Sequence, residues 1–201
     1  MLQRFVPFAL AVAVAAPFAA TPAVAATWDI DTSHSIAGFW VRHLVVAKVR
    51  GNFNDWSGTV VLDEKDVTKS SVNVTIKTAS IDTGTAKRDE HLRSDDFFNA
   101  TKYPEIKFKS TKVEAGKEKG TLKVTGDLTI RDVTKSVVLD VTGPSPEFKD
   151  PGGNAHVAFS AITKINRKDY GLKWSNATEA GPVAGEEVTI EIEIELKGKK
   201  P

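Results

Sequence analysis

The chain has 201 residues, with 27 lysines and arginines against 26 aspartates and glutamates, and it contains no cysteine. This near balance of charge, without runs of basic residues, excludes the electrostatic footprint of a protein that binds nucleic acid. Without cysteine there is no disulfide bond, thiol nucleophile or lipid-modified cysteine, so an apolar core or a closed sheet has to stabilise the fold.

The N-terminus has the order of a secretory signal peptide. A basic residue precedes an apolar stretch from Phe5 to Phe18, and small residues then lead to cleavage positions at Ala25 and Ala26. A membrane anchor is the alternative, but the apolar run is short and is bracketed by prolines. We therefore expect residues 1–26 to be a cleaved signal peptide and residues 27–201 to form one domain.

Apolar and polar residues alternate along most of this domain, as in β-strands that bury one face. One stretch, from Thr85 to Leu92, instead predicts a short helix with Thr85 as its N-cap. Turn-forming residues, such as those at 143–146, separate the alternating segments. In chain order, the expected strands are 35–46, 52–62, 72–77, 105–113, 121–130, 135–142, 154–165 and 188–197.

About eight such strands must bury their apolar faces in either a sandwich or a barrel, and the alternation alone leaves both open. The helix lies between two strands, where it can cover one end of a barrel.

Short motifs spread over the whole domain resemble the YceI family. They are Trp28-Asp29-Ile30-Asp31 with His34-Ser35, Gly51-Asn52-Phe53, Ser80-Ile81-Asp82-Thr83-Gly84 with Arg88-Asp89-Glu90-His91-Leu92, Tyr103-Pro104-Glu105-Ile106, Gly126-Asp127-Leu128-Thr129-Ile130 and Arg167-Lys168-Asp169-Tyr170-Gly171-Leu172. The resemblance implies an all-β fold: an extended, lipocalin-like, eight-stranded antiparallel barrel with one short helix. It also implies a periplasmic protein that binds a polyisoprenoid or a similar amphiphile and has no established catalytic activity.

Two residues depart from the usual family pattern. Asp132 stands where glycine is common, and we expect it to adopt a positive φ angle in a turn. Tyr170 replaces a phenylalanine, which adds a hydroxyl and leaves the fold intact.

A barrel of this size either fills its interior with side chains or holds one small ligand. Many residues on the apolar faces are small or β-branched, which favours a cavity. Each buried methylene contributes about 0.8 kcal/mol, so a long tail needs only an apolar tube. The large side chains expected to contact the tail, with plain core packing as the alternative for each, are Phe39, Leu44, Phe53, Phe97, Phe108 and Trp174.

Polar residues of the same motifs are candidates for a head-group site at the barrel mouth. The guanidinium of Arg88 or Arg167 suits an anionic or carbonyl head group. Alternatively, Arg88 with Asp89 and Arg167 with Asp169 form internal ion pairs. The full set of head-group candidates is His34, His43, Arg88, Asp89, His91, Arg167, Asp169 and Tyr170.

Other classes of function have weaker support in the sequence. The spacing of the four histidines matches no compact metal motif, and Ser35 beside His34 lacks the strand–elbow–helix context of a hydrolase. We expect no catalytic residue, no metal and no cofactor beyond a bound isoprenoid lipid or quinone. A metal-dependent or quinone-linked enzyme, or a partner-docking protein of the bacterial envelope, is the alternative. Transient membrane contact and pairing of two barrels stay open.

Overall fold

The computed structural model describes residues 26–63, 65–179 and 181–198. The expected signal peptide lies outside the described residues except for Ala26, which opens the first strand. None of the helices in these ranges has both the length and the apolar character needed to cross a membrane.

The described chain is mostly antiparallel strand, with one α-helix and short 3₁₀ turns. In chain order the elements are β1 (Ala26–Ile30), β2 (Ile36–His43), β3 (Ala47–Phe53), β4 (Trp56–Leu62), η1 (Val67–Lys69), β5 (Ser71–Lys77), η2 (Thr78–Ser80), β6 (Ile81–Asp82), α1 (Ala86–Arg93), β7 (Glu105–Ala115), β8 (Thr121–Ile130), β9 (Val133–Thr142), β10 (Phe148–Lys149), β11 (Ala155–Asn166), η3 (Arg167–Tyr170), β12 (Ala177–Thr178), β13 (Gly181–Pro182) and β14 (Ala184–Gly198).

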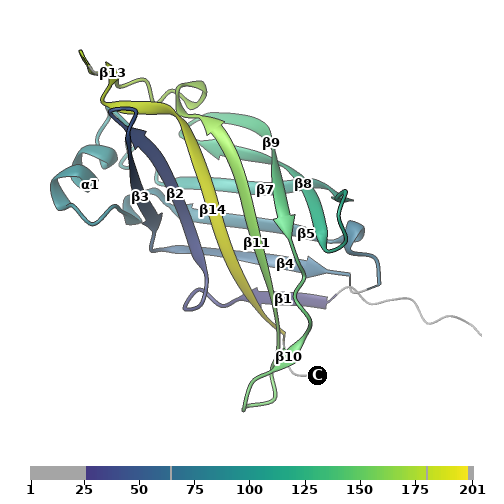
Figure 1. Ribbon diagram of the computed structural model, residues 1–201. Coiled ribbons are helices and arrows are strands. Elements are labelled where there is room, and N and C mark those ends of the chain that lie inside the picture. The colour runs from purple at the N-terminus through teal and green to yellow at the C-terminus, as the bar shows by residue number, and fades with distance from the viewer. Residues whose placement is uncertain (1–25, 64, 180, 199–201) are drawn as a thin grey trace, which may run out of the picture.

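Eight of these strands close into a barrel (Figure 1). Neighbouring strands follow the order β11, β9, β8, β7, β5, β4, β1 and β14, and β14 pairs again with β11. On its other side β14 pairs first with β2 and, near its end, with β1. Strands β2, β3 and β6 therefore extend the wall at one end. This closure confirms the eight-stranded antiparallel barrel and decides against a sandwich.

The side chains of the long strand β14 point alternately into the barrel and outward, as the sequence predicts. Its apolar residues at alternate positions from Val188 to Leu196 face the barrel interior. Glu191 lies on the other face, where it accepts hydrogen bonds from Trp40 and Arg50. The apolar pattern thus encodes the interior.

The turn between β2 and β3 was not predicted from the sequence. The expected strand 35–46 ends at His43, because Leu44 and Val45 have φ angles of 48° and 67° and reverse the chain into β3. A tight hairpin with positive φ angles normally carries Asn or Gly, and this one carries neither. Strand β3 was therefore not predicted, nor was β1.

One local expectation was wrong and one was confirmed. The residue with positive φ before β9 is Arg131, at 57°, and not Asp132. The predicted helix is present as α1 with Thr85 at its N-cap position, where the Thr85 carbonyl accepts from the Arg88 and Asp89 N–H groups, although the Thr85 side chain makes no capping hydrogen bond.

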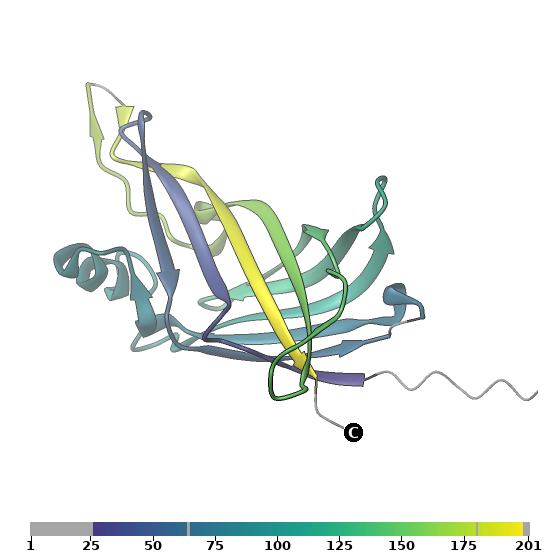
Figure 2. The ribbon, with the colours of Figure 1, turned by 60° about the horizontal axis from the view of Figure 1, so that its bottom comes forward.

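One end of the barrel gathers α1, η3, the β2–β3 turn and the small β12–β13 hairpin (Figures 1 and 2). Strand pairing places the last residues of β5, β8 and β11 at this same end. We call it the α1 end, and the opposite one the β1 end. The β1 end is packed with a buried cluster of Trp28, Leu62, Val157 and Leu196.

Candidate functional site

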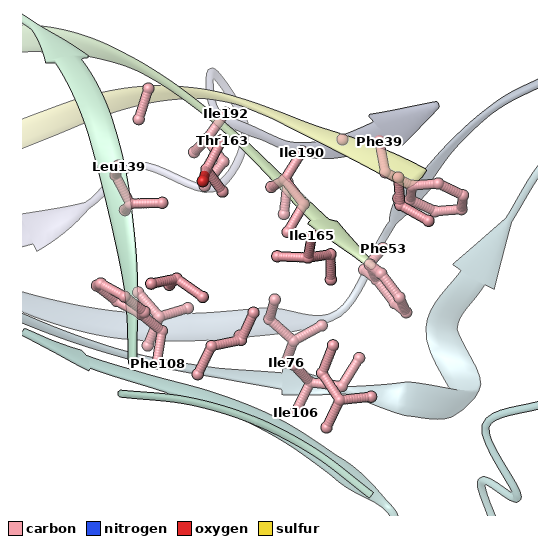
Figure 3. A pocket seen from close by; sticks show the side chains of 18 of the residues that line it. Phe39, Phe53, Ile76, Ile106, Phe108, Leu139, Thr163, Ile165, Ile190 and Ile192 are labelled. Atoms are coloured by element: carbon pink, nitrogen blue, oxygen red, sulfur yellow. The ribbon is translucent and has the colours of Figure 1, made fainter. Parts of the chain in front are cut away.

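A cavity of about 680 Å³ runs through the barrel. Strands β2 and β3 and every strand of the ring except β1 contribute lining residues, nearly all of them apolar. Figure 3 shows how Ile76, Ile106, Leu139, Ile190 and Ile192 point toward one another across this space. The interior is therefore a lined cavity and not a filled core.

The cavity is long as well as apolar. Lining residues on β14 run from Ala184 to Leu196. Twelve steps of about 3.4 Å on a strand tilted by about 40° span roughly 30 Å along the barrel axis. That length is close to the full hydrocarbon thickness of a bilayer, about 30 Å, and so about twice what one leaflet spans.

Aromatic rings concentrate in the half of the cavity nearest the α1 end. The rings of Phe39 and Phe53 lie 5.8 Å apart, and those of Phe97 and Trp174 lie 5.2 Å apart. Phe108 lies farther along the barrel, over Gly126, whose missing side chain leaves room for the ring. All five aromatic residues expected to contact the tail line the cavity.

Leu44, the remaining tail candidate, is placed differently. It lies in the β2–β3 turn, half-buried, and is not among the lining residues.

The lining residues with ionisable side chains are all of basic types, and no carboxylate of the described residues lines the cavity. They come from the end of β2, from α1 and from η3, which meet at the α1 end. The sequence reasoning missed Arg42 and Lys87, because neither lies at a marked position of a motif. The basic lining residues are Arg42, His43, Lys87, Arg88, His91 and Arg167.

Arg88 and Asp89 do not pair with each other; both bind Thr83. Arg88 Nε donates to Thr83 Oγ1 at 2.7 Å, and its Nη2 donates to the Thr83 carbonyl at 2.7 Å. The buried Asp89 carboxylate accepts from the Thr83 N–H at 2.9 Å and from the Thr83 hydroxyl at 2.5 Å. The two side chains thus fix the start of α1 to Thr83, directly after β6, while Arg88 still borders the cavity.

Arg167 is buried and satisfied by backbone carbonyls instead of by Asp169. Its Nε donates to the Gly185 carbonyl at 2.8 Å and its Nη1 to that of Leu172 at 2.5 Å. Burial lowers the pKa of Arg167, yet a guanidinium stays charged in proteins. Asp169 lies on the surface, 3.8 Å from the Lys135 ammonium. The proposed Arg167–Asp169 ion pair is therefore not formed.

Tyr170 is fully buried in the core cluster that includes Phe53, Ile81 and Leu172. Burial raises the pKa of the Tyr170 phenol to about 12. Tyr170 is not among the lining residues of the cavity, so it packs in the core behind the lining and does not face the cavity.

The histidines separate between the two ends. At the α1 end, His43 Nδ1 lies 2.8 Å from the Val183 carbonyl, and the His91 ring stands edge-on to Phe97 and Trp174, with Nε2 2.8 Å from an Asp96 oxygen. His34 is exposed near the β1 end, far along the barrel from α1.

His34 belongs to a small cluster with Asp31 and Glu195, whose ligand atoms lie within 4.8 Å of one another in the described chain. The Ser33 hydroxyl and then His34 hold the pKa of Asp31 at about 2, and Asp31 in turn raises the pKa of His34. These hydrogen bonds complete the turn before β2. They account for Asp31 and His34, while the Glu195 carboxylate lies 2.7 Å from His156 Nδ1.

Comparison with known proteins gives one family. The model of the YceI-like domain matches residues 28–196. Protein YceI of Shigella flexneri is 43% identical over 180 residues, which cover 89% of this chain and 90% of that protein.

Solved structures agree with the fold. YceI protein of Campylobacter jejuni is 35% identical, with a TM-score of 0.68 over 79% of this chain and 90% of that one. A polyisoprenoid binding domain from Saccharophagus degradans, implicated in plant cell wall breakdown, is similar at a TM-score of 0.61 and 18% identity, covering 87% of this chain and 99% of that one. At that identity the likeness concerns the fold alone.

Proposed function

The chain belongs to the YceI-like family, and on that premise we propose that it binds a polyisoprenoid or a similarly long amphiphile inside its barrel. The tail occupies the apolar cavity, and the head group lies among the basic residues of the α1 end. The observation that carries the proposal is this polarity: a long apolar cavity whose charged lining residues are of one sign and at one end.

The length of the cavity favours a long chain. A chain that fills roughly 30 Å is longer than the acyl tail of a phospholipid, which spans half of the hydrocarbon core. At about 0.8 kcal/mol for each methylene, every part of the tube left empty lowers affinity. A polyisoprenoid of the kind that the Saccharophagus domain is named for meets this requirement.

The basic rim favours an anionic head group over a neutral one such as a quinone. Arg88 and Arg167 already donate to the protein itself, so they contribute mainly charge. Lys87 is an exposed residue of α1 that borders the cavity, and its ammonium has room to approach a phosphate.

We further propose that the protein is a carrier in the periplasm and does not act as an enzyme. The order of basic, apolar and small residues before Ala26 supports export. Ser35, the one serine that suggested a hydrolase, is buried and bonded to the Glu195 backbone: its Oγ accepts from the N–H at 2.9 Å. His34 points to Asp31 instead.

Native mass spectrometry of gently purified protein tests the binding. We expect a stoichiometric lipid, or uptake of a polyprenyl phosphate offered in detergent, with weaker uptake of the matching polyprenol and of a quinone. Lys87→Gln is expected to reduce the ratio of polyprenyl phosphate uptake to polyprenol uptake severalfold, because one charge is removed without loss of a packed contact. A protein that takes up none of these lipids would refute the proposal.

A further inference from the structure

The β2–β3 turn, Leu44 to Val46, presents apolar side chains to solvent. Val45 is 57% exposed and Val46 is 77% exposed, more than any other large apolar residue of the described chain. We call these three residues the apolar turn. Single exposed apolar residues are ordinary, but adjacent ones at the tip of a hairpin are not explained by the core.

The backbone of this turn makes the residue choice more unusual. Leu44 and Val45 both have positive φ angles, and a β-branched residue rarely adopts that conformation. Asparagine and glycine would form the same turn with less strain. Residues that break a local rule without a structural gain point to a role outside folding.

The base of the turn is held in place by hydrogen bonds. The Leu44 N–H donates to the Val183 carbonyl at 3.2 Å, and Arg42 Nη1 donates to the Val46 carbonyl at 3.1 Å. Lys48 Nζ lies 3.8 Å from the centre of the Trp40 ring. A tryptophan flanked by Arg and Lys behind an apolar tip is the arrangement found where proteins meet the headgroup region of a membrane.

The apolar turn lies beside the basic end of the cavity, which we take to be its entrance. Arg42 and His43, which precede it, line the cavity, as do Val183 and Ala184 across from it. Figure 2 shows this hairpin, the β12–β13 hairpin and α1 at the same end of the barrel. A surface that met the turn would therefore also meet the entrance.

Charge near the turn favours an anionic surface. Neither Arg42 nor Lys48 forms an ion pair within the described residues, whereas Glu186 and Glu191 are paired with Lys168 and Arg50. Glu179, on the β12–β13 hairpin, opposes this charge. The valines are thus expected to supply most of the binding free energy. The basic residues are expected to supply the preference for an anionic surface.

We propose that the apolar turn inserts into the surface of an anionic bilayer and so brings the cavity entrance to the lipid. This step rests on the proposed function and names the surface that the carrier contacts. Two valines form too small a patch for a stable protein partner, which normally buries at least about 1,200 Å² in total. A small apolar tip with flanking basic residues is sufficient for reversible membrane contact.

Vesicle flotation tests the insertion. The variant combines Val45→Asn, which suits the positive φ angle, with Val46→Ser; the matched control is Val138→Ser, at a valine 47% exposed on the outer face of β9. We expect wild type and control to float with phosphatidylglycerol–phosphatidylethanolamine vesicles and less with phosphatidylcholine vesicles. Removing both valines should weaken partitioning at least about tenfold. Circular dichroism and thermal melting check that both variants are folded.

A second measurement separates this inference from the proposed function. Uptake of polyprenyl phosphate from vesicles should slow in the double variant, while uptake from detergent micelles should stay unchanged. If the double variant floats as wild type does, the apolar turn is not the contact and the inference is overturned, whatever lipid the barrel holds. Vesicle binding that depends on the valines supports the inference even if micellar uptake of this lipid fails, which would count against the proposed cargo alone.

Discussion

Narrowing the cavity at mid-length should block the tail without touching the head-group region. Ala161 on β11 faces the cavity, with Val141 and Ile192 opposite it on the neighbouring strands. Ala161 packs against the buried cluster of Leu122, Val124, Leu139 and Val141 at the cavity wall. The change Ala161→Phe adds a phenyl group beside a cavity of about 680 Å³, so the fold should tolerate it. The ring takes up room that about four chain carbons would fill, which at about 0.8 kcal/mol each removes ~3 kcal/mol of binding free energy.

That loss corresponds to an affinity more than a hundredfold lower. The assay is displacement of a fluorescent polyprenyl analogue from protein stripped of lipid. The matched control is Ile162→Phe, because Ile162 is the next residue on β11 and lies exposed on the outer face. If Ala161→Phe binds the analogue as tightly as wild type, the tail does not pass this level of the barrel. Equal loss in the control would show that the ring acts through the fold.

Three further changes test the structure around the cavity. Gly126→Ala should lower the free energy of unfolding in urea by about 1–3 kcal/mol, because the new Cβ would meet the Phe108 ring at 2.4 Å; an unchanged midpoint would refute this packing. Asp31→Asn should lower the pKa of His34 toward its ordinary value, because Asp31 is the main cause of the raised pKa. NMR titration of the His34 ring measures this pKa, and an unchanged titration midpoint would contradict the Asp31–His34 contact. The Tyr170 phenol should ionise near pH 12 in the folded protein. Its neutral form is favoured by folding, so stability should fall as the pH rises from about 10 toward 12, and Tyr170→Phe should flatten that fall in alkaline melting curves.

The barrel wall was largely predictable because each strand repeats a simple rule. From Val188 to Leu196 the alternation marks every residue that faces the interior, and the pairing partners follow the same rule. Closure was not predictable from alternation, since a sandwich needs the same pattern; it depends on β14 pairing on both sides, with β11 and with β1. The family motifs supplied that step.

The site was predictable where it depends on ring size and strand position, as for Phe39 and Phe53, which line the cavity. It was not predictable where partners come from distant strands. Arg167 lies 18 residues before Gly185, whose carbonyl accepts a hydrogen bond from its guanidinium. Nothing in the sequence shows that the partner of this guanidinium is a backbone carbonyl and not the Asp169 carboxylate. The Leu44–Val46 turn escaped detection because turn prediction depends on Gly, Asn, Asp and Pro, and the turn has none.

The two ends of the barrel differ in a way that sets the direction of an amphiphile inside it. At the β1 end the buried cluster around Trp28 and Leu196 offers no cation to the cavity, and an anionic head group there would lose its hydration without compensation. At the α1 end the cavity is lined by basic residues, of which Lys87 is exposed to water. A bound amphiphile is therefore expected to lie with its tail toward Trp28 and its head group among Lys87, Arg88 and His91. The apolar turn is at that same end, so a lipid taken from a bilayer that the turn contacts would have to turn its tail from the hydrocarbon into the cavity. If the turn seats this end in the headgroup region, as we propose, the head group is expected to stay at the interface while the tail makes that passage.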